Sequence, residues 1–209
     1  EPGRILRVAQ ELNADIIALQ EVDFPRQDHA PIAPWLAQKT GMIAIGGPVW
    51  SREGVGYGNA LLSRYPVDRV RRWDLSVGRH EPRGALDVEL TICGRTVHVL
   101  NTHLGLWPRE RPQQADRLLE LLSLSRRDLT ILMGDLNEWH GWGKSLRGLR
   151  RVFGSPAAPV TFPARWPVLA LDRIWIFPAQ ALLTVEAHDT PRSRLASDHL
   201  PVKADIYLP

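Results

Sequence analysis

Apolar positions recur along this chain with two periods, one typical of helices and one typical of strands. From Pro2 to Leu12 the apolar residues lie three or four positions apart, which predicts a helix that has proline in its first turn and is closed by Asn13. The run 14–20 is apolar and contains β-branched residues, which predicts a strand buried on both faces. Further helices are expected over 34–40 and 108–125.

Short apolar runs between turn residues predict strands in much of the remaining chain. Residues 93–95, Cys-Gly-Arg, have the composition of a hairpin turn, whereas the glycines from Gly46 to Gly58 predict a loop. The stretch rich in tryptophan and proline that follows Asn137 is expected to be irregular. No repeat or linker divides the chain, so we expect one domain over residues 1–209, with mixed strands and a few helices packed on two sheets. The expected strands, besides 14–20, are 42–45, 60–63, 67–73, 85–92, 96–101, 129–133, 169–176, 182–186 and 202–207.

Composition excludes several classes of protein but does not select a partner. The single cysteine, Cys93, excludes an internal disulfide, and no apolar run approaches the roughly 18 residues of a membrane span. The chain has 23 arginines and three lysines, a bias that would suit phosphate binding but that genomic composition explains better. These cations are scattered, without a polybasic run, at a formal net charge of +3.

Acid, amide and imidazole side chains stand at the ends of several expected strands. One such side chain alone is more often a helix cap or a surface charge. Together they predict a cleft, because strand ends that point the same way bring their side chains to one edge of a sheet. Oxygen donors without a cysteine cluster suit Mg²⁺ or Mn²⁺ better than structural zinc. The residues are Glu21, Asn101, His103, Asp135, Asn137, Asp172, Asp198 and His199.

The sharpest of these segments is Gly134-Asp135-Leu136-Asn137. If it is extended, Asp135 and Asn137 point to the same side. One would then accept a proton from water, and the other would donate a hydrogen bond to an oxyanion. Gly134 would allow the backbone to approach a neighbour closely.

Five ordered segments resemble the motifs of the endonuclease/exonuclease/phosphatase superfamily, the group that includes DNase I. The resemblance implies a DNase I-like four-layer α/β/β/α sandwich, in which helices flank two packed mixed sheets. It extends from Glu21 to the end of the chain. The segments are Leu19-Gln20-Glu21-Val22-Asp23, Asn101-Thr102-His103-Leu104, Gly134-Asp135-Leu136-Asn137, Leu171-Asp172-Arg173-Ile174 and Ser197-Asp198-His199-Leu200-Pro201.

The resemblance also implies a role for each catalytic residue. Asp135 would orient or deprotonate the attacking water, and Asn137 would hold a phosphoryl oxygen. His199, oriented by Asp172, would stabilise the phosphate in the transition state, and His103 would contact the phosphate or assist the leaving oxygen. These roles agree with in-line displacement at phosphorus, where negative charge builds on oxygens that a metal and cationic imidazoles stabilise.

By the same resemblance, Glu21 would be a ligand of Mg²⁺ or Mn²⁺, with Asp198 beside that metal or a second one. Members of the family start with a strand that ends in an asparagine near the metal, and this sequence begins at the helix expected after that strand. We expect the strand to lie upstream of Glu1; the alternative is a domain with weakened metal binding. The longer, tyrosine-rich loops of abasic-site enzymes are absent, which disfavours that activity.

Further residues have positions that fit either function or structure. Asn59, Arg83 and Asn101 are candidate substrate-binding residues, although Asn59 and Arg83 would equally suit a strand start or a turn. Four tryptophans follow the motif strands and would stack on a nucleobase, lie among lipid headgroups or cap the core. They are Trp107, Trp139, Trp142 and Trp166.

The sequence therefore predicts a Mg²⁺-dependent hydrolase that cleaves a phosphodiester by attack of an activated water. A diester is favoured over a monoester because the sequence has no cluster of lysines of the kind that a polyphosphate-binding site would need. DNA or RNA is the favoured substrate; a phospholipid headgroup, as in sphingomyelinases, a phosphomonoester and a non-catalytic phosphate-binding domain are the alternatives. We expect a cytoplasmic monomer, or an exported protein if a signal peptide precedes Glu1, and contact with a membrane stays open.

Overall fold

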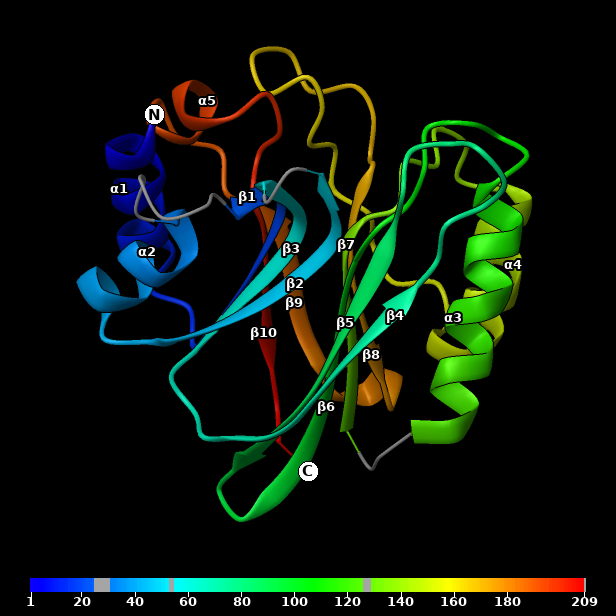
Figure 1. The fold of residues 1–209 in the computed structure, drawn as a ribbon, viewed down its shortest axis with the longest axis horizontal. Helices are drawn as coiled ribbons and strands as arrows, with labels where there is room; N and C mark the ends of the chain where they lie inside the picture. Colours follow the sequence, from blue (N-terminus) through cyan, green and yellow to red (C-terminus); the bar gives the residue numbers. More distant parts are fainter. Residues whose placement is uncertain (25–30, 53–54, 126–128, 209) are drawn as a thin grey trace.

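The computed structural model describes residues 1–24, 31–52, 55–125 and 129–208 (Figure 1). Strands dominate, and helices lie at the two outer faces. In chain order the elements are α1 (Pro2–Leu12), β1 (Ile16–Phe24), α2 (Ile32–Thr40), β2 (Ile43–Arg52), β3 (Val55–Ser63), β4 (Val67–Asp74), β5 (Gly84–Ile92), β6 (Arg95–His103), α3 (Arg111–Ser125), β7 (Leu129–Asp135), α4 (Lys144–Phe153), β8 (Asp172–Phe177), the 3₁₀ turn η1 (Ala179–Ala181), β9 (Leu182–Ala187), α5 (Ser193–Ala196) and β10 (Val202–Ile206).

The strands form two packed layers. One layer is a five-stranded sheet of order β4-β5-β6-β7-β8, in which β6 and β7 are parallel and the other neighbours are antiparallel. The other layer contains the antiparallel sheet β1-β3-β2 and the antiparallel hairpin of β9 and β10. Helices α3 and α4 cover the five-stranded sheet, and α1 and α2 cover β1-β3-β2 (Figure 1). The four-layer α/β/β/α arrangement is thus confirmed.

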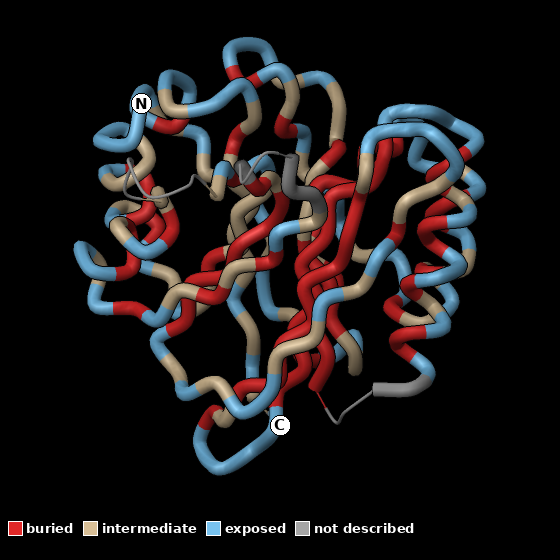
Figure 2. The backbone as a smooth tube through the Cα atoms, in the orientation of Figure 1, coloured by how far each residue is buried: buried red, intermediate tan, exposed pale blue. Residues whose placement is uncertain are grey.

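Three apolar clusters hold the four layers together. Figure 2 shows buried residues along the strands and helices. The cluster between the sheets includes Leu61, Val88 and Val99, which are fully buried. Leu100 belongs to the cluster under α3 and α4 instead. Neighbouring residues of β6 therefore point to opposite faces of the sheet, because side chains alternate along a strand. Both faces of this sheet are buried.

The glycine-rich segment from Gly46 to Gly58 is not a loop, as the sequence suggested, but belongs largely to strands β2 and β3. A Cβ atom at Gly58 would lie 2.3 Å from the carbonyl oxygen of Gly47, and one at Gly47 would lie 3.0 Å from Leu86 Cβ. These glycines permit close approach between strands and between sheets. The hairpin turn at Cys93 and Gly94 is confirmed: both residues have positive φ, at 51° and 76°.

Helix α4 lies in the stretch that was expected to be irregular. Its residues Leu146, Leu149 and Phe153 are buried under the five-stranded sheet, at spacings of three and four. The helical period is present in the sequence, but the surrounding tryptophans and prolines obscured it. Within the described parts of the chain, no helix is long and apolar enough to cross a bilayer.

A groove of about 550 Å³ separates β1 from β10. Apolar side chains line it, among them Ile16, Ala18, Val202 and Ile206. The strand that the family resemblance places before Glu1 would neighbour β1, and this expectation stays a prediction because it concerns residues outside the sequence.

We expect Gly58→Ala to lower the free energy of unfolding by about 2 kcal/mol or more, because the added methyl group meets the main chain of Gly47, which cannot move aside as a side chain would. Urea denaturation measures the change. The control is Gly3→Ala, where no atom lies within 4 Å of the added Cβ. Equal stability of the two variants would contradict the close-approach explanation.

Candidate active site

The ends of three adjacent strands bring the main catalytic candidates together. In the ladder of β6 and β7, His103 pairs with Asp135, and in the ladder of β7 and β8, Asp135 pairs with Asp172. Strands β6 and β7 finish at this edge and β8 starts there. A Cβ atom at Gly134, which has φ of 140°, would lie 1.8 Å from the carbonyl oxygen of Thr102. The predicted close backbone approach at Gly134 is therefore confirmed.

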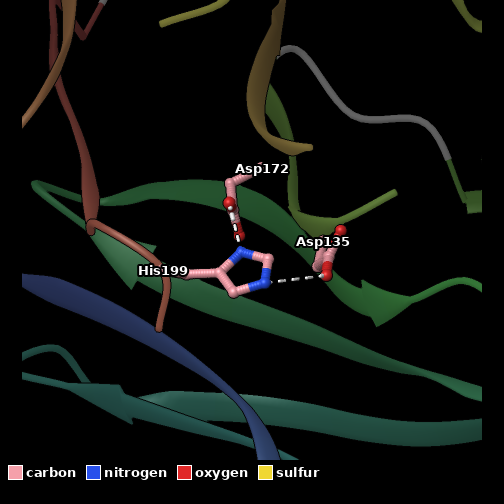
Figure 3. A group of neighbouring side chains, drawn as sticks. All are labelled: Asp135, Asp172 and His199. Carbon is pink, nitrogen blue, oxygen red and sulfur yellow. Dashed lines mark hydrogen bonds and ion pairs between the residues drawn. The ribbon is translucent and has the colours of Figure 1, made fainter. Parts of the chain in front are cut away.

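His199 and Asp172 form a hydrogen-bonded pair at this edge (Figure 3). The imidazole Nδ1 lies 2.8 Å from Asp172 Oδ2, and Nε2 lies 4.0 Å from Asp135 Oδ2. The hydroxyl of Thr161 donates a 2.5 Å hydrogen bond to the same Asp172 oxygen. Both contacts hold the carboxylate, which in turn sets the plane of the imidazole.

The local charges make His199 a cation at neutral pH. Burial by itself lowers the pKa of this imidazole, but the hydrogen bond and the charge of Asp172 outweigh burial, and Asp135 adds to their effect. The resulting pKa is about 9. His199 thus presents a positive charge to the space beside Asp135.

Asp135 is a buried carboxylate whose basicity is raised. Burial is the main cause, and the charge of Asp172 adds to it, so that the pKa of Asp135 rises to about 6. Its Oδ1 accepts the main-chain N–H of Asn137 at 2.8 Å, while Oδ2 faces His103 and His199. A carboxylate of this kind suits proton transfer near neutral pH.

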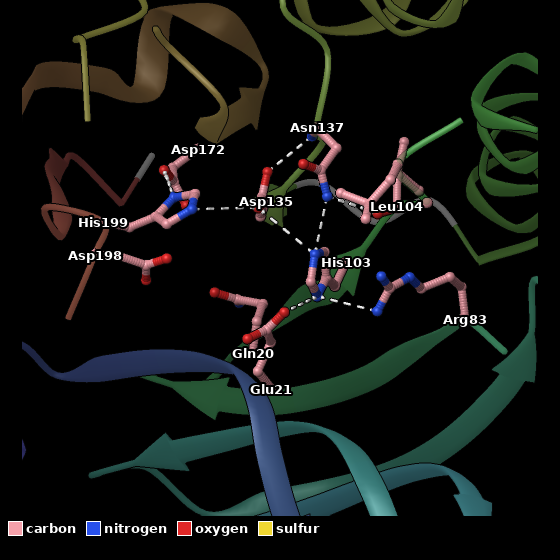
Figure 4. Close-up of polar contacts among 12 residues, drawn as sticks. Gln20, Glu21, Arg83, His103, Leu104, Asp135, Asn137, Asp172, Asp198 and His199 are labelled. Carbon is pink, nitrogen blue, oxygen red and sulfur yellow. Dashed lines mark hydrogen bonds and ion pairs between the residues drawn. The ribbon is translucent and has the colours of Figure 1, made fainter. Parts of the chain in front are cut away.

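Asn137 reaches the site by a turn of the backbone. Its φ of 50° is left-handed, so the extended geometry expected for Asp135 and Asn137 is wrong. The turn still directs both side chains to one place (Figure 4), because Nδ2 of Asn137 donates to the carbonyl oxygen of Leu104 and approaches His103 Nε2, each at 2.9 Å.

His103 is neutral, unlike His199. Burial first, and then the positive charges of Arg83 and His199, lower the pKa of His103 to about 3. Its Nε2 lies 2.9 Å from the Asn137 amide nitrogen, and its Nδ1 lies 3.4 Å from Arg83 Nη1 and 3.9 Å from Glu21 Oε1. The expected pair of cationic imidazoles is therefore reduced to His199 alone, and His103 instead fixes the Asn137 amide.

Glu21 provides an accessible carboxylate on the opposite wall. It lies inside β1 rather than at the end of a strand, at a shift of register between Leu19 and Val22, and its φ is 55°. Its side chain is 64% exposed, and its contact with Tyr57, together with burial, raises the pKa of that phenol. The bulge directs the carboxylate toward His103 (Figure 4).

The acidic groups around this space fit a hard divalent cation. Ligand atoms of Asp135, Asp172 and His199 lie within 4.8 Å of one another. Asp172 and His199 already bond to each other, however, which leaves the accessible carboxylates of Glu21 and Asp198 as the better donors. Figure 4 shows Asp198 between His199 and Glu21, so the candidate metal ligands predicted from the sequence face one space.

The three candidate substrate-binding residues have interior positions. Asn101 is fully buried, donates to the carbonyl oxygens of Leu19 and Ala60, and accepts from Gln20. Asn59 is buried and donates to a main-chain carbonyl at 3.0 Å. Both amides therefore bond the main chain of the sheets, and their assignment to substrate binding stays a prediction.

Arg83 is also buried, but it lies beside the site. Its Nη2 bonds Glu81 at 2.8 Å, and its Nη1 lies 3.4 Å from His103 Nδ1. The guanidinium thus acts on the site through charge. Thr161, which orients Asp172, was missed because a lone threonine in an irregular stretch carries no signal in the sequence.

The family is decided by the match of its profile to residues 1–199, described as the endonuclease/exonuclease/phosphatase family. The chain belongs to this family. Its members are phosphoesterases that generally use a divalent metal, and the acid and imidazole groups above agree with such chemistry.

Relatives and solved structures support the same family. The uncharacterized protein YbhP of Escherichia coli strain K12 is 32% identical over 94% of this chain and 85% of its own length. A family protein from Leptotrichia buccalis has a TM-score of 0.79 at 15% identity, covering 99% of this chain and 92% of its own. A mannosyl-6-phosphatase from Bacteroides thetaiotaomicron also has a TM-score of 0.79, at 17% identity, covering 99% and 90%. At these identities the two structures show the fold.

We expect the His199 imidazole of the metal-free protein to titrate near pH 9, as measured by NMR in EDTA. Asp172→Asn should lower this pKa by more than about one unit, because the neutral amide no longer stabilises the imidazolium while burial still opposes it. The control is Asp205→Asn, which removes an exposed carboxylate bonded to Thr184. An unshifted His199 pKa in the Asp172 variant would show that this pair does not set the charge.

Proposed function

We propose that this protein is a divalent-cation-dependent phosphodiesterase that uses water activated by Asp135. The observation that carries the proposal is the cationic His199 held by Asp172 with its Nε2 4.0 Å from the carboxylate of Asp135. A base of near-neutral pKa and a fixed positive charge thus border one space, as attack of water on an anionic phosphate requires.

Each residue then has a defined task. Asp135 accepts the proton of the attacking water as the new oxygen–phosphorus bond forms and the ester oxygen–phosphorus bond breaks. His199 donates a hydrogen bond to a non-bridging phosphoryl oxygen, where negative charge increases. Neutral His103 keeps the Asn137 amide in place beside the same oxygens.

Glu21 and Asp198 would hold the Mg²⁺ or Mn²⁺ ion. When bound, such an ion neutralises charge on the phosphoryl and leaving oxygens. The exposed carboxylate of Glu21, held toward the site by its left-handed backbone, provides the oxygen ligand that these ions prefer.

A diester fits the charges of the site better than a monoester does. Among the described residues, the cations in contact with the candidate catalytic side chains are His199 and the buried Arg83, whose guanidinium is already paired with Glu81. A dianionic monoester would require more positive charge than a monoanionic diester. Nucleic acid and phospholipid headgroups both contain such diesters, and the mannosyl-6-phosphatase, a fold neighbour, makes a monoester substrate a necessary comparison.

We expect the protein to hydrolyse bis-p-nitrophenyl phosphate when Mg²⁺ or Mn²⁺ is present and to lose this activity in EDTA. Hydrolysis of p-nitrophenyl phosphate should be slower. Asp135→Asn should lower kcat by about 1,000-fold, because the amide cannot accept the proton of water. Asp205→Asn, distant from the site, is the control. Full activity of the Asp135 variant would exclude the proposed base.

Calorimetric titration separates the enzyme from a non-catalytic phosphate-binding domain. We expect Mg²⁺ to bind the unaltered chain and Glu21→Gln to weaken this binding by at least about tenfold, since the amide provides a weaker ligand than the carboxylate. Asp205→Asn again serves as the control. If Mg²⁺ binding does not occur, or does not depend on Glu21, the assigned metal position is wrong.

A further inference from the structure

Exposed apolar side chains gather on the loops around the candidate active site. The exposed fractions are 62% for Leu106 and Trp107, 60% for Trp139, 80% for Trp142 and Trp166, and 70% for Val168. These six residues, here called the apolar rim, follow β6, follow β7 or precede β8. Those are the strand ends that carry His103, Asp135 and Asp172, and the loops lie along the upper side of the molecule in Figure 1.

Buried polar groups hold the first rim loop from below. The Glu110 carboxylate accepts the N–H of Trp107 at 2.9 Å, and the Arg111 guanidinium donates to the carbonyl oxygen of Leu106 at 2.6 Å. Both supporting side chains are buried. A Cβ atom at Gly105 would lie 1.9 Å from the Glu110 carboxylate. The main chain is therefore fixed while Leu106 and Trp107 stay exposed.

The second rim loop is fixed in the same way. Buried Glu138 accepts the hydroxyl of Ser145 at 2.6 Å and lies 3.6 Å from Arg111 Nε. A Cβ atom at Gly143 would lie 2.1 Å from this carboxylate. The Glu138–Arg111 contact joins the loop of Trp139 and Trp142 to the loop of Trp107. Two of the rim loops are thus built on buried polar supports, and exposed apolar groups gathered around a site of this kind mark interaction surfaces.

Cations border the apolar rim. Arg79, Arg109, Lys144 and Arg165 lie in or beside the same loops and are exposed, and in the described chain no ion pair is found for them. Arg79 precedes His80, whose ring stacks on Trp107 with centroids 6.0 Å apart. Apolar groups surrounded by unneutralised positive charge complement a surface that is both anionic and apolar beneath its headgroups.

We propose that the apolar rim docks this protein on an anionic phospholipid bilayer, with the active-site cleft facing the headgroups. Tryptophan is enriched at bilayer interfaces, and juxtaposed arginines are attracted to anionic lipids. Leu106 and Val168 favour a bilayer over a single-stranded nucleic acid, because they have no aromatic face to stack on a base but insert among acyl chains. Trp107 and Trp142 already stack on His80 and His140.

Docking does not rest on the proposed phosphodiesterase activity, since it is measured without turnover. The whole chain in EDTA is mixed with vesicles of phosphatidylcholine alone or of phosphatidylcholine and phosphatidylglycerol at 3:1, and binding is followed by co-sedimentation and by the tryptophan emission maximum. We expect binding to the anionic vesicles, with a blue shift, and weaker binding at high salt.

The combined variant Trp107→Ser, Trp142→Ser and Trp166→Ser should bind the anionic vesicles at least tenfold more weakly. The matched control removes two exposed apolar side chains at the far ends of β9 and β10, Leu183→Ser and Tyr207→Ser, which are 63% and 59% exposed. The control should change binding less than twofold. Far-UV circular dichroism and urea denaturation report folding of each variant. Trp142→Ser with Trp166→Ser alone provides a second test should the triple variant fold poorly.

A second set of variants tests the exposed cations beside the apolar rim. The combined variant Arg79→Gln, Arg109→Gln and Arg165→Gln should lower the ratio of binding to anionic over neutral vesicles at least fivefold. Arg69→Gln with Arg95→Gln, on exposed positions at the opposite ends of β4 and β6, should not.

Three results would overturn the proposal: no binding to either vesicle, equal binding by the tryptophan variant and its control, or binding to single-stranded DNA that depends on these tryptophans while vesicle binding does not. The last result would assign the apolar rim to nucleic acid. Since all arms are run in EDTA, loss of docking and absence of hydrolytic activity are separate observations.

Discussion

The parallel pairing of β6 with β7 is the constraint on which the site depends. It places His103 beside Asp135, and the antiparallel partner β8 adds Asp172 at the same level. The pairing is possible at this point because residue 134 is glycine, whose missing Cβ leaves room for the Thr102 carbonyl. A shift of one residue would turn the side chains of β7 to the opposite faces and separate Asp135 from its neighbours.

Within this frame, buried charge determines what each side chain does. Two histidines of the same intrinsic pKa end with opposite protonation at neutral pH. At His199 the bond and charge of Asp172 outweigh burial, whereas at His103 burial and then the charge of Arg83 both disfavour the proton. The two assignments support each other: the cation on His199 further disfavours a proton on His103. The neutral His103 can then accept the Asn137 amide, and this bond holds the amide near Asp135.

The sequence was sufficient for the layers and for the strand-end chemistry, because both follow from local patterns. Apolar periods locate most strands, and acids or imidazoles at their ends mark the edge where Asp135, Asp172 and His199 meet. It failed where a residue's role depends on a distant partner. The sequence predicts a loop at Gly58, and only the nearby main chain of Gly47 shows why a strand needs glycine there. Nor does the sequence reveal that the Asn101 amide donates to the carbonyl oxygens of Leu19 and Ala60. Thr161 gains its function from a contact eleven positions away.

The site and the apolar rim follow opposite physical rules. The candidate catalytic groups Asp135 and His103 are buried, and burial is the main cause of their shifted pKa values. The rim side chains are exposed apolar groups, yet the loops that carry them are fixed by buried ionic groups, Arg111 and Glu138, which are costly to desolvate unless paired. Because those supports hold main chain, the rim side chains can vary without disturbing the catalytic edge. The proposed docking and the proposed hydrolysis thereby rest on separate sets of residues within one fold.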